Sequence, residues 1–218
     1  SDAFKALAKE NILAMVCDST NATREGHSVS EQQCYKGLKK AVAEAKGRVV
    51  VGCFSSNIAR LISLAKIAQE TNRYFALFGR SLQNTVGAAK ATGHWPDDLP
   101  VLDAFNTGYL LPQEVLAVAT GSQGEPRAAL NQLAKDTYRN VSLDEGDLVI
   151  FSSIVIPGNE KPIENLLEAY KARKIHTLMA DESELPIHAS GHPCQEELKK
   201  MYEWVRPDIA IPTHGEVE

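Results

Sequence analysis

The stretch RVVVGCFSSNIARLISLAKIAQETN, residues 48–72, contains the pattern from which we predict the fold. Its first seven residues form a short, almost continuous apolar run, which is typical of a strand buried on both faces. The remainder places apolar residues at helical spacing, and Asn57 can cap the start of that helix. A buried strand followed by an amphipathic helix is the repeating element of a parallel sheet covered by helices.

The same alternation continues on both sides of this stretch. Further strands are expected at residues 12–18, 74–79, 114–121, 147–153, 175–180 and 207–215, and further helices at 30–47, from Ser81, from about Glu125, from about Lys161 and at 195–205. GHWPDDLP, residues 93–100, reads as a surface loop. The predicted fold class is therefore α/β: a three-layer, Rossmann-like domain with a mainly parallel sheet.

Composition narrows the functional classes. A chain of 218 residues that is 44% hydrophobic can bury one large core or two small ones. No apolar run reaches the roughly 18 residues of a membrane span, and the net charge of −5 argues against strong non-specific binding of nucleic acid, although a narrow basic groove stays possible. The four cysteines form no CxxC pair, so reduced thiols and a cytoplasmic location are expected.

Polar or glycine-rich residues follow many of the predicted strands. The segments are DSTN after residue 17, SSN after 54, GRS after 78, TGSQGEP at 120–126 and SSIVIPGNE at 152–160. Any one of them alone is more often a helix cap joined to a turn. Because the carboxyl ends of parallel strands share one edge, several together favour a phosphate-binding rim there.

TGSQGEP matches neither of two catalytic or cofactor motifs that it resembles in part. A nucleophile elbow needs G-x-S-x-G, but Thr120 takes the first glycine position, so an esterase that uses Ser122 is rejected. A dinucleotide fingerprint needs three glycines, and only Gly121 and Gly124 are present.

Three of the six histidines lie near the end of the sequence. His188 and His192 flank a Ser-Gly pair in HASGH, where the neighbouring prolines favour a loop that enters a helix. His214 follows a predicted buried strand, and Asp18 ends another. Taken singly, the two HASGH histidines are more often surface or capping residues, and Asp18 is more often a cap.

Taken together and in order, CDSTNA, TGSQGEP, SSIVIPGNE, HASGH and IPTHGE resemble the bacterial ribonuclease J family, the β-CASP branch of the metallo-β-lactamase superfamily. The resemblance covers nearly the whole chain. It implies a zinc-dependent exo- or endoribonuclease, in which two zinc ions activate a water for phosphodiester hydrolysis. It also implies RNA as the partner and a homo-oligomer at full length.

The resemblance assigns a role to each matching residue. Asp18 resembles the acid that orients the imidazole of His192, which acts as proton donor or charge stabiliser. His214 resembles a zinc ligand. The residues expected to hold substrate phosphate are His188, Ser190, Ser122, Ser152 and Ser153, converging on one pocket where a protonated imidazole adds a charge-assisted bond.

One departure from the family pattern divides the chain. The HxHxDH signature is absent, so the sequence is expected to be a β-CASP domain at 28–184 between two pieces of the metallo-β-lactamase domain, at 1–27 and 185–218. The missing half of that domain would then be a partner of this piece, which alone should bind zinc weakly and cleave no RNA. The alternative is a stand-alone Rossmann-like module that binds a nucleotide or phosphate without catalysis.

Overall fold

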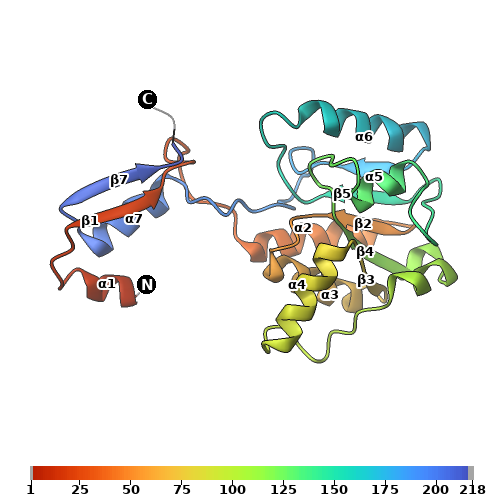
Figure 1. Ribbon diagram of the computed structural model, residues 1–218, viewed down its shortest axis with the longest axis horizontal. Coiled ribbons are helices and arrows are strands. Elements are labelled where there is room, and N and C mark those ends of the chain that lie inside the picture. Colours follow the sequence, from red (N-terminus) through yellow and green to blue (C-terminus); the bar gives the residue numbers. More distant parts are fainter. Residues whose placement is uncertain (1, 216–218) are drawn as a thin grey trace. The chain divides into compact units, whose positions relative to one another are not determined.

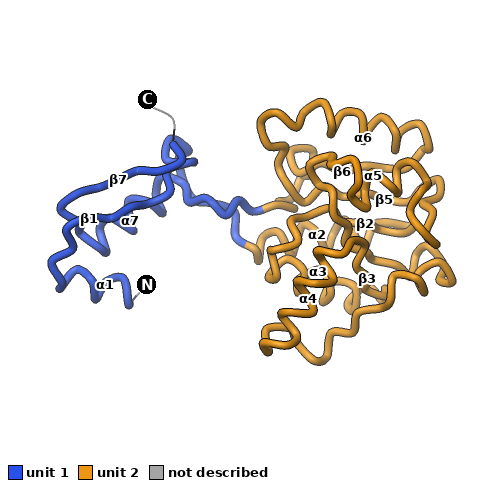
Figure 2. The backbone as a smooth tube through the Cα atoms, in the orientation of Figure 1, with its two compact units in different colours: residues 1–30, 189–218 blue, residues 31–188 orange. Residues whose placement is uncertain are grey.

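The computed structural model describes residues 2–215, which form two compact units (Figure 2). Unit 1 comprises residues 1–30 and 189–218, and unit 2 comprises residues 31–188. The boundaries expected from the sequence were 27/28 and 184/185. That unit 2 is a β-CASP domain and unit 1 is part of a metallo-β-lactamase domain stays a proposal.

Unit 2 contains a five-stranded sheet in the order β3-β4-β2-β5-β6, in which every neighbouring pair is parallel. The strands are β2 (Val49–Gly52), β3 (Tyr74–Phe78), β4 (Val115–Ala119), β5 (Leu148–Phe151) and β6 (His176–Leu178). All of β2 and β4 is buried, as the apolar runs predict. The predicted parallel α/β class is therefore confirmed.

Helices cover both faces of this sheet (Figure 1). They are α2 (Glu31–Glu44), α3 (Ile58–Glu70), α4 (Arg80–Ala91), α5 (Ala129–Ala134) and α6 (Glu160–Ala172). Because side chains alternate across a strand, Val49 and Val51 pack with α2, α3 and α4, whereas Val50 packs with α5 and α6. The two clusters of buried side chains make the domain three-layered.

The segment between β4 and α5 differs from the prediction. A helix was expected from about Glu125, but α5 begins at Ala129. The Glu125 carboxylate instead accepts a hydrogen bond from the backbone of Gln123, and Gly124 takes a positive φ of 78° against Pro162. These turns occupy the residues in which the helix was expected to begin.

Two 3-10 helices, η1 (Ala104–Tyr109) and η2 (Pro112–Glu114), precede β4, and neither was predicted. The predicted surface loop at 93–100 is irregular, but Trp95 and Leu99 are buried, and the indole N–H donates to the Leu99 carbonyl at 2.9 Å. That loop thus contributes to the core.

Unit 1 consists of α1 (Asp2–Leu7), β1 (Ala14–Asp18), α7 (Gln195–Val205) and β7 (Ile209–Thr213). The two strands pair in parallel, and Asp18 lies opposite Thr213 in the register. Several apolar side chains of this small sheet are exposed: Val16 by 65%, Ile209 by 50% and Ile211 by 42%. Within residues 2–215, no helix has the length and apolar character needed to cross a membrane.

Candidate functional site

Asp18 and His192 form a hydrogen-bonded pair in unit 1. The carboxylate oxygen Oδ2 of Asp18 lies 2.9 Å from Nδ1 of His192. The other carboxylate oxygen accepts the backbone N–H of Thr20 at 3.0 Å, which is the largest cause of a lowered pKa for Asp18; the imidazole adds to it. An ionised carboxylate only accepts hydrogen bonds, so Nδ1 must carry the proton. This tautomer leaves Nε2 as the reactive nitrogen.

The loop around His192 is held by polar contacts to the residues that follow β1. The Ser190 hydroxyl accepts the backbone N–H of His192 at 3.1 Å, and the amide of Asn21 donates to the same hydroxyl at 3.4 Å. Asn21 also donates to the His192 carbonyl at 3.3 Å and bridges in parallel to Cys194, the residue that caps α7. Asn21 was not singled out from the sequence, although it stands in the CDSTNA motif. Asn21 thus connects the residues that follow β1 to the loop that precedes α7.

His214 lies at the same edge of the β1–β7 sheet as Asp18, because it directly follows the residue that pairs with Asp18. The backbone and hydroxyl of Ser19 both donate to the Thr213 carbonyl, at 2.7 and 2.8 Å, and hold the end of β7. His214 itself is exposed and has a positive φ of 61°. A side chain beyond a strand end is free to reach outward for a ligand.

The described residues do not make a zinc site of their own. Zinc sites in proteins use at least three protein ligands. Among residues 2–215, no group of three or more His, Cys, Asp or Glu side chains is arranged to hold a metal ion. His214 is one potential ligand.

His188 belongs to unit 2, at the carboxyl edge of its sheet. Its Nδ1 lies 3.1 Å from the Ser152 carbonyl, an acceptor, so Nδ1 again carries the proton. Burial lowers the pKa of His188, the Ser152 contact and Glu31 oppose this, and Arg60 adds to it. The expectation of a protonated imidazole is therefore revised, because the lowered pKa favours the neutral form at pH 7.

Three of the four serines proposed for phosphate binding, Ser122, Ser152 and Ser153, are buried in unit 2. Ser152 is 1% exposed and donates its hydroxyl to the Ile187 carbonyl at 2.6 Å. Ser153 donates to the Ser122 carbonyl at 3.3 Å, and both of these residues are buried. The structure thus joins His188 to Ser152 and Ser122 to Ser153, but each of these hydrogen bonds is internal to the protein. Ser190 lies in unit 1, so a single pocket containing all of these residues stays a prediction.

Two further residues organise this edge and were missed in the sequence. The Gln123 side chain accepts from the backbone of Ile156 at 3.0 Å and donates to the Ile154 carbonyl at 2.9 Å, which holds the loop after β5. Arg60 on α3 is 1% exposed and contacts Glu31, Ser152 and Ile187. A signal for Arg60 existed: it shares a helix face with Leu64 and Ile67, which are buried.

Comparison with known proteins gives two matching family models. One, described as "Ribonuclease J, beta-CASP domain", matches residues 46–170, and another, described as "Zn-dependent metallo-hydrolase RNA specificity domain", matches residues 186–218.

Similar curated proteins carry the name Ribonuclease J. That of Sinorhizobium meliloti is 44% identical over 213 residues, which is 98% of this chain and 37% of the relative. That of Mycolicibacterium smegmatis is 35% identical over 92% of this chain and 36% of its own length. That of Mycoplasma pneumoniae is 36% identical over 96% of this chain and 37% of its own length. The chain thus spans little more than a third of the length of these relatives.

Proposed function

The chain belongs to the ribonuclease J family, and on that premise we propose that its two units form the RNA-clamping and proton-transfer parts of a zinc-dependent ribonuclease. Unit 2 would be the β-CASP domain, since the matching family model at 46–170 lies inside it. Unit 1 would be part of the metallo-β-lactamase domain. Family membership favours this function over the stand-alone binding module.

The observation that carries the proposal is the 2.9 Å hydrogen bond between Asp18 and His192. A carboxylate that accepts Nδ1–H fixes the tautomer and the orientation of the ring. In the protonated imidazole, Nε2–H is then the donor that gives its proton to the leaving oxygen when water displaces it from phosphorus. The P–O bond breaks, water supplies the new oxygen, and the imidazole is left neutral.

His214 is proposed as a ligand of one of two zinc ions in the longer protein. Its place beside Asp18 at one sheet edge supports this, and residues 2–215 contain no group of three or more His, Cys, Asp or Glu side chains that could hold the ion without further ligands. The exposed apolar side chains of β1 and β7 support a further proposal, that more of the nuclease domain covers this sheet.

RNA is the proposed substrate and partner, gripped chiefly through its phosphates. Ser190 in unit 1 and His188 in unit 2 are each proposed to contact RNA phosphate. Ser152 and Ser153 donate their hydroxyls to backbone carbonyls, and Ser122 is buried, so we propose that these three serines stabilise the phosphate-binding loops without contacting the phosphate. A homo-oligomer and a cytoplasmic location stay predictions.

The test compares two histidines in the full-length ribonuclease. His192→Ala is expected to lower the rate of RNA cleavage by about 10²–10⁴-fold, the usual contribution of a general acid, with zinc content unchanged. His214→Ala should lower both rate and zinc content. His94→Ala, which changes a side chain bonded only locally to Thr92, is the matched control and should change neither. A loss below about tenfold for His192→Ala, or equal zinc loss in both variants, would refute the assignment.

A further inference from the structure

Arg60 is a buried cation whose hydrogen bonds are made to three separate parts of unit 2. Its Nε and one terminal nitrogen donate to the two Glu31 carboxylate oxygens, each at 2.9 Å. The other terminal nitrogen donates to the Ile187 carbonyl at 3.2 Å and contacts the Ser152 hydroxyl. A guanidinium is costly to bury unless it is paired and hydrogen-bonded, and this set of partners meets that requirement.

The partners of Arg60 come from the beginning, the interior and the end of the sequence of unit 2. Glu31 is the first residue of unit 2, and Ile187 directly precedes its last residue, His188. Ser152 follows β5 at the carboxyl edge of the sheet. One side chain therefore joins both sequence ends of the unit to a central strand of its sheet.

The same contacts lead directly to His188. Ser152 donates its hydroxyl to the Ile187 carbonyl at 2.6 Å, and its own carbonyl lies 3.1 Å from the imidazole Nδ1. Arg60 holds both Ser152 and Ile187, so it fixes the backbone that carries the imidazole and the group that orients it. Asn57 caps α3 by accepting the Arg60 backbone N–H and also donates to the Glu31 carboxylate, so it holds Arg60 and Glu31 together.

We propose that Arg60 is a positioning residue for the recognition of RNA phosphate: by clamping Glu31, Ser152 and Ile187 it sets the place and tautomer of the His188 imidazole. This inference rests on the proposed function, because that function assigns the phosphate contact to His188. Arg60 itself is buried and touches no substrate in this scheme.

An alternative role for Arg60 predicts the opposite result. The charged groups that act on the imidazole are Arg60, whose cation adds to the lowering of the His188 pKa by burial, and Glu31, which opposes it. If Arg60 acted only through its charge, its removal would raise the His188 pKa and strengthen the binding of an anion. If it positions the ring, its removal should weaken binding in spite of the raised pKa.

The experiment uses the 218-residue chain with ¹⁵N-labelled histidine and an RNA tetranucleotide without a terminal phosphate. Its diester charge is constant across the pH range, so only the protein titrates. The variants are Arg60→Met, Arg60→Lys, His188→Ala and Arg73→Met. Arg73 is the matched control: it is another buried arginine of unit 2, but it bonds to the backbone carbonyls of Val42, Ala45, Gly47 and Val115.

For wild type, the ¹⁵N shifts should show the Nδ1–H tautomer. In Arg60→Met we expect loss of that tautomer preference and at least fivefold weaker RNA binding at pH 6, and Arg60→Lys should recover only part of both. Arg73→Met should leave the tautomer and the affinity unchanged even if it lowers stability. Where Arg60→Met does not fold, the Arg60→Lys comparison decides by the same criteria.

Two outcomes overturn the inference. Unchanged or tighter RNA binding in the folded Arg60 variants would show that the residue does not position the ring for RNA, and an unaltered tautomer would show that it does not position the ring at all. The His188→Ala arm separates this from the proposed function: if that variant binds RNA like wild type, the phosphate role of His188 fails. The tautomer readout still judges Arg60 in that event, because it needs no ligand.

Discussion

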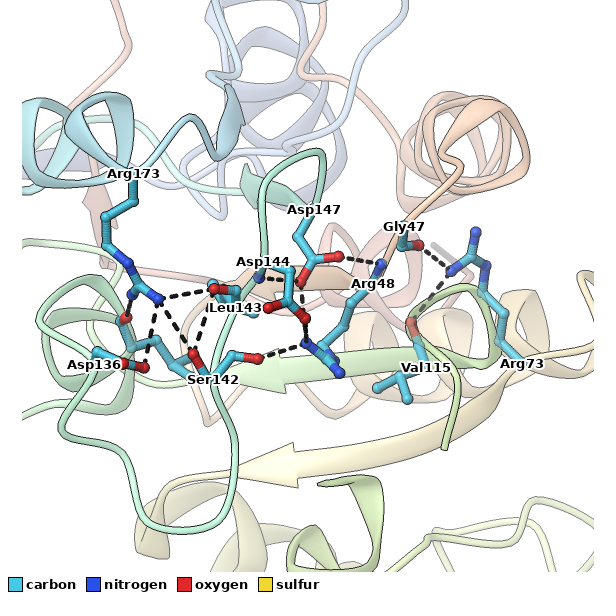
Figure 3. A network of polar contacts seen from close by, with 11 residues as sticks. Gly47, Arg48, Arg73, Val115, Asp136, Ser142, Leu143, Asp144, Asp147 and Arg173 are labelled. Atoms are coloured by element: carbon cyan, nitrogen blue, oxygen red, sulfur yellow. Dashed lines mark hydrogen bonds and ion pairs between the residues drawn. The ribbon is translucent and has the colours of Figure 1, made fainter. Parts of the chain in front are cut away.

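Replacing Asp147 by asparagine should destabilise unit 2 strongly. Asp147 is 1% exposed and ends the turn that leads into β5 (Figure 3). Its carboxylate accepts the Arg48 backbone N–H at 2.7 Å, the Arg48 guanidinium at 3.0 Å and the Asp144 backbone N–H at 2.9 Å. Asparagine keeps the shape but loses the charge, and its NH₂ group must face one of these donors.

The expected cost follows from what remains buried. The Arg48 side chain is only 6% exposed, so it would be left as a buried cation without a full partner. Breaking a buried ion pair from one side typically costs about 3–5 kcal/mol of unfolding free energy. The control is Asp144→Asn, since that carboxylate lies 3.9 Å from the same guanidinium but is 68% exposed. Exposed pairs of this kind contribute roughly 0–1 kcal/mol.

Urea unfolding followed by tryptophan fluorescence can measure this difference in unit 2 alone. The sequence has two tryptophans, Trp95 in unit 2 and Trp204 in unit 1. In a Trp204→Phe background, the buried Trp95 reports only unit 2. A loss below about 1 kcal/mol for Asp147→Asn, or equal losses for both substitutions, would refute the reasoning, because the buried and exposed carboxylates would then be equivalent.

Three further predictions concern a close packing contact, acid stability and ligand binding. Gly37→Ala should destabilise unit 2, because its Cβ would lie 2.1 Å from a backbone oxygen, whereas Gly87→Ala, with nothing within 4 Å, should stabilise it by about 0.5–1 kcal/mol in the same urea assay. The Thr20 N–H is the main cause of the lowered pKa of Asp18, so the ionised carboxylate stabilises unit 1 above its unfolded-state pKa of about 3.8, and this contribution is lost as pH falls through the lower folded value. In Asp18→Asn the unfolding free energy of unit 1 should therefore fall less steeply as the pH is lowered, and a pH dependence equal to that of wild type would contradict this. The pKa of His188 is lowered by burial, so affinity for an RNA tetranucleotide should rise as pH falls from 7.5 to 5.5, and a His188→Gln variant with the same pH dependence would disprove the link.

The strands of unit 2 were predictable because their burial is complete. A strand such as β2, covered on both faces, must be apolar at every position, so its sequence differs from that of a surface helix. The start of α5 was not predictable in this way. Gly124 and Glu125 stabilise turns through a positive φ and a local side-chain bond, which leave no periodic pattern. Trp95 illustrates a second reason, since a single apolar side chain in a polar loop does not reveal that the loop folds back onto the core.

The candidate site was predicted by motif rather than by physics, and this explains where the prediction was incomplete. Asp18 and His192 were named because each occupies a motif position, and they do form a pair. Ser152 also occupies a motif position, yet a serine after a buried strand has another use: it can satisfy backbone groups that burial removes from water. The same residue type at the same strand end serves a ligand or the protein, and only the position of neighbouring carbonyl groups decides between them.

Arg60 shows the reverse case, in which elementary physics locates a residue that no motif marks. An arginine on the buried face of an amphipathic helix must either disrupt the core or find partners there. Its partners had to come from chain segments that end at the sheet edge, because backbone carbonyls inside the strands are already paired. The buried face of α3 packs against one face of the sheet, so the acceptors available to Arg60 were those of Glu31, Ser152 and Ile187 at the carboxyl edge of the sheet. Burial of one charge thus required a polar network at the same edge where the proposed function places the RNA phosphate.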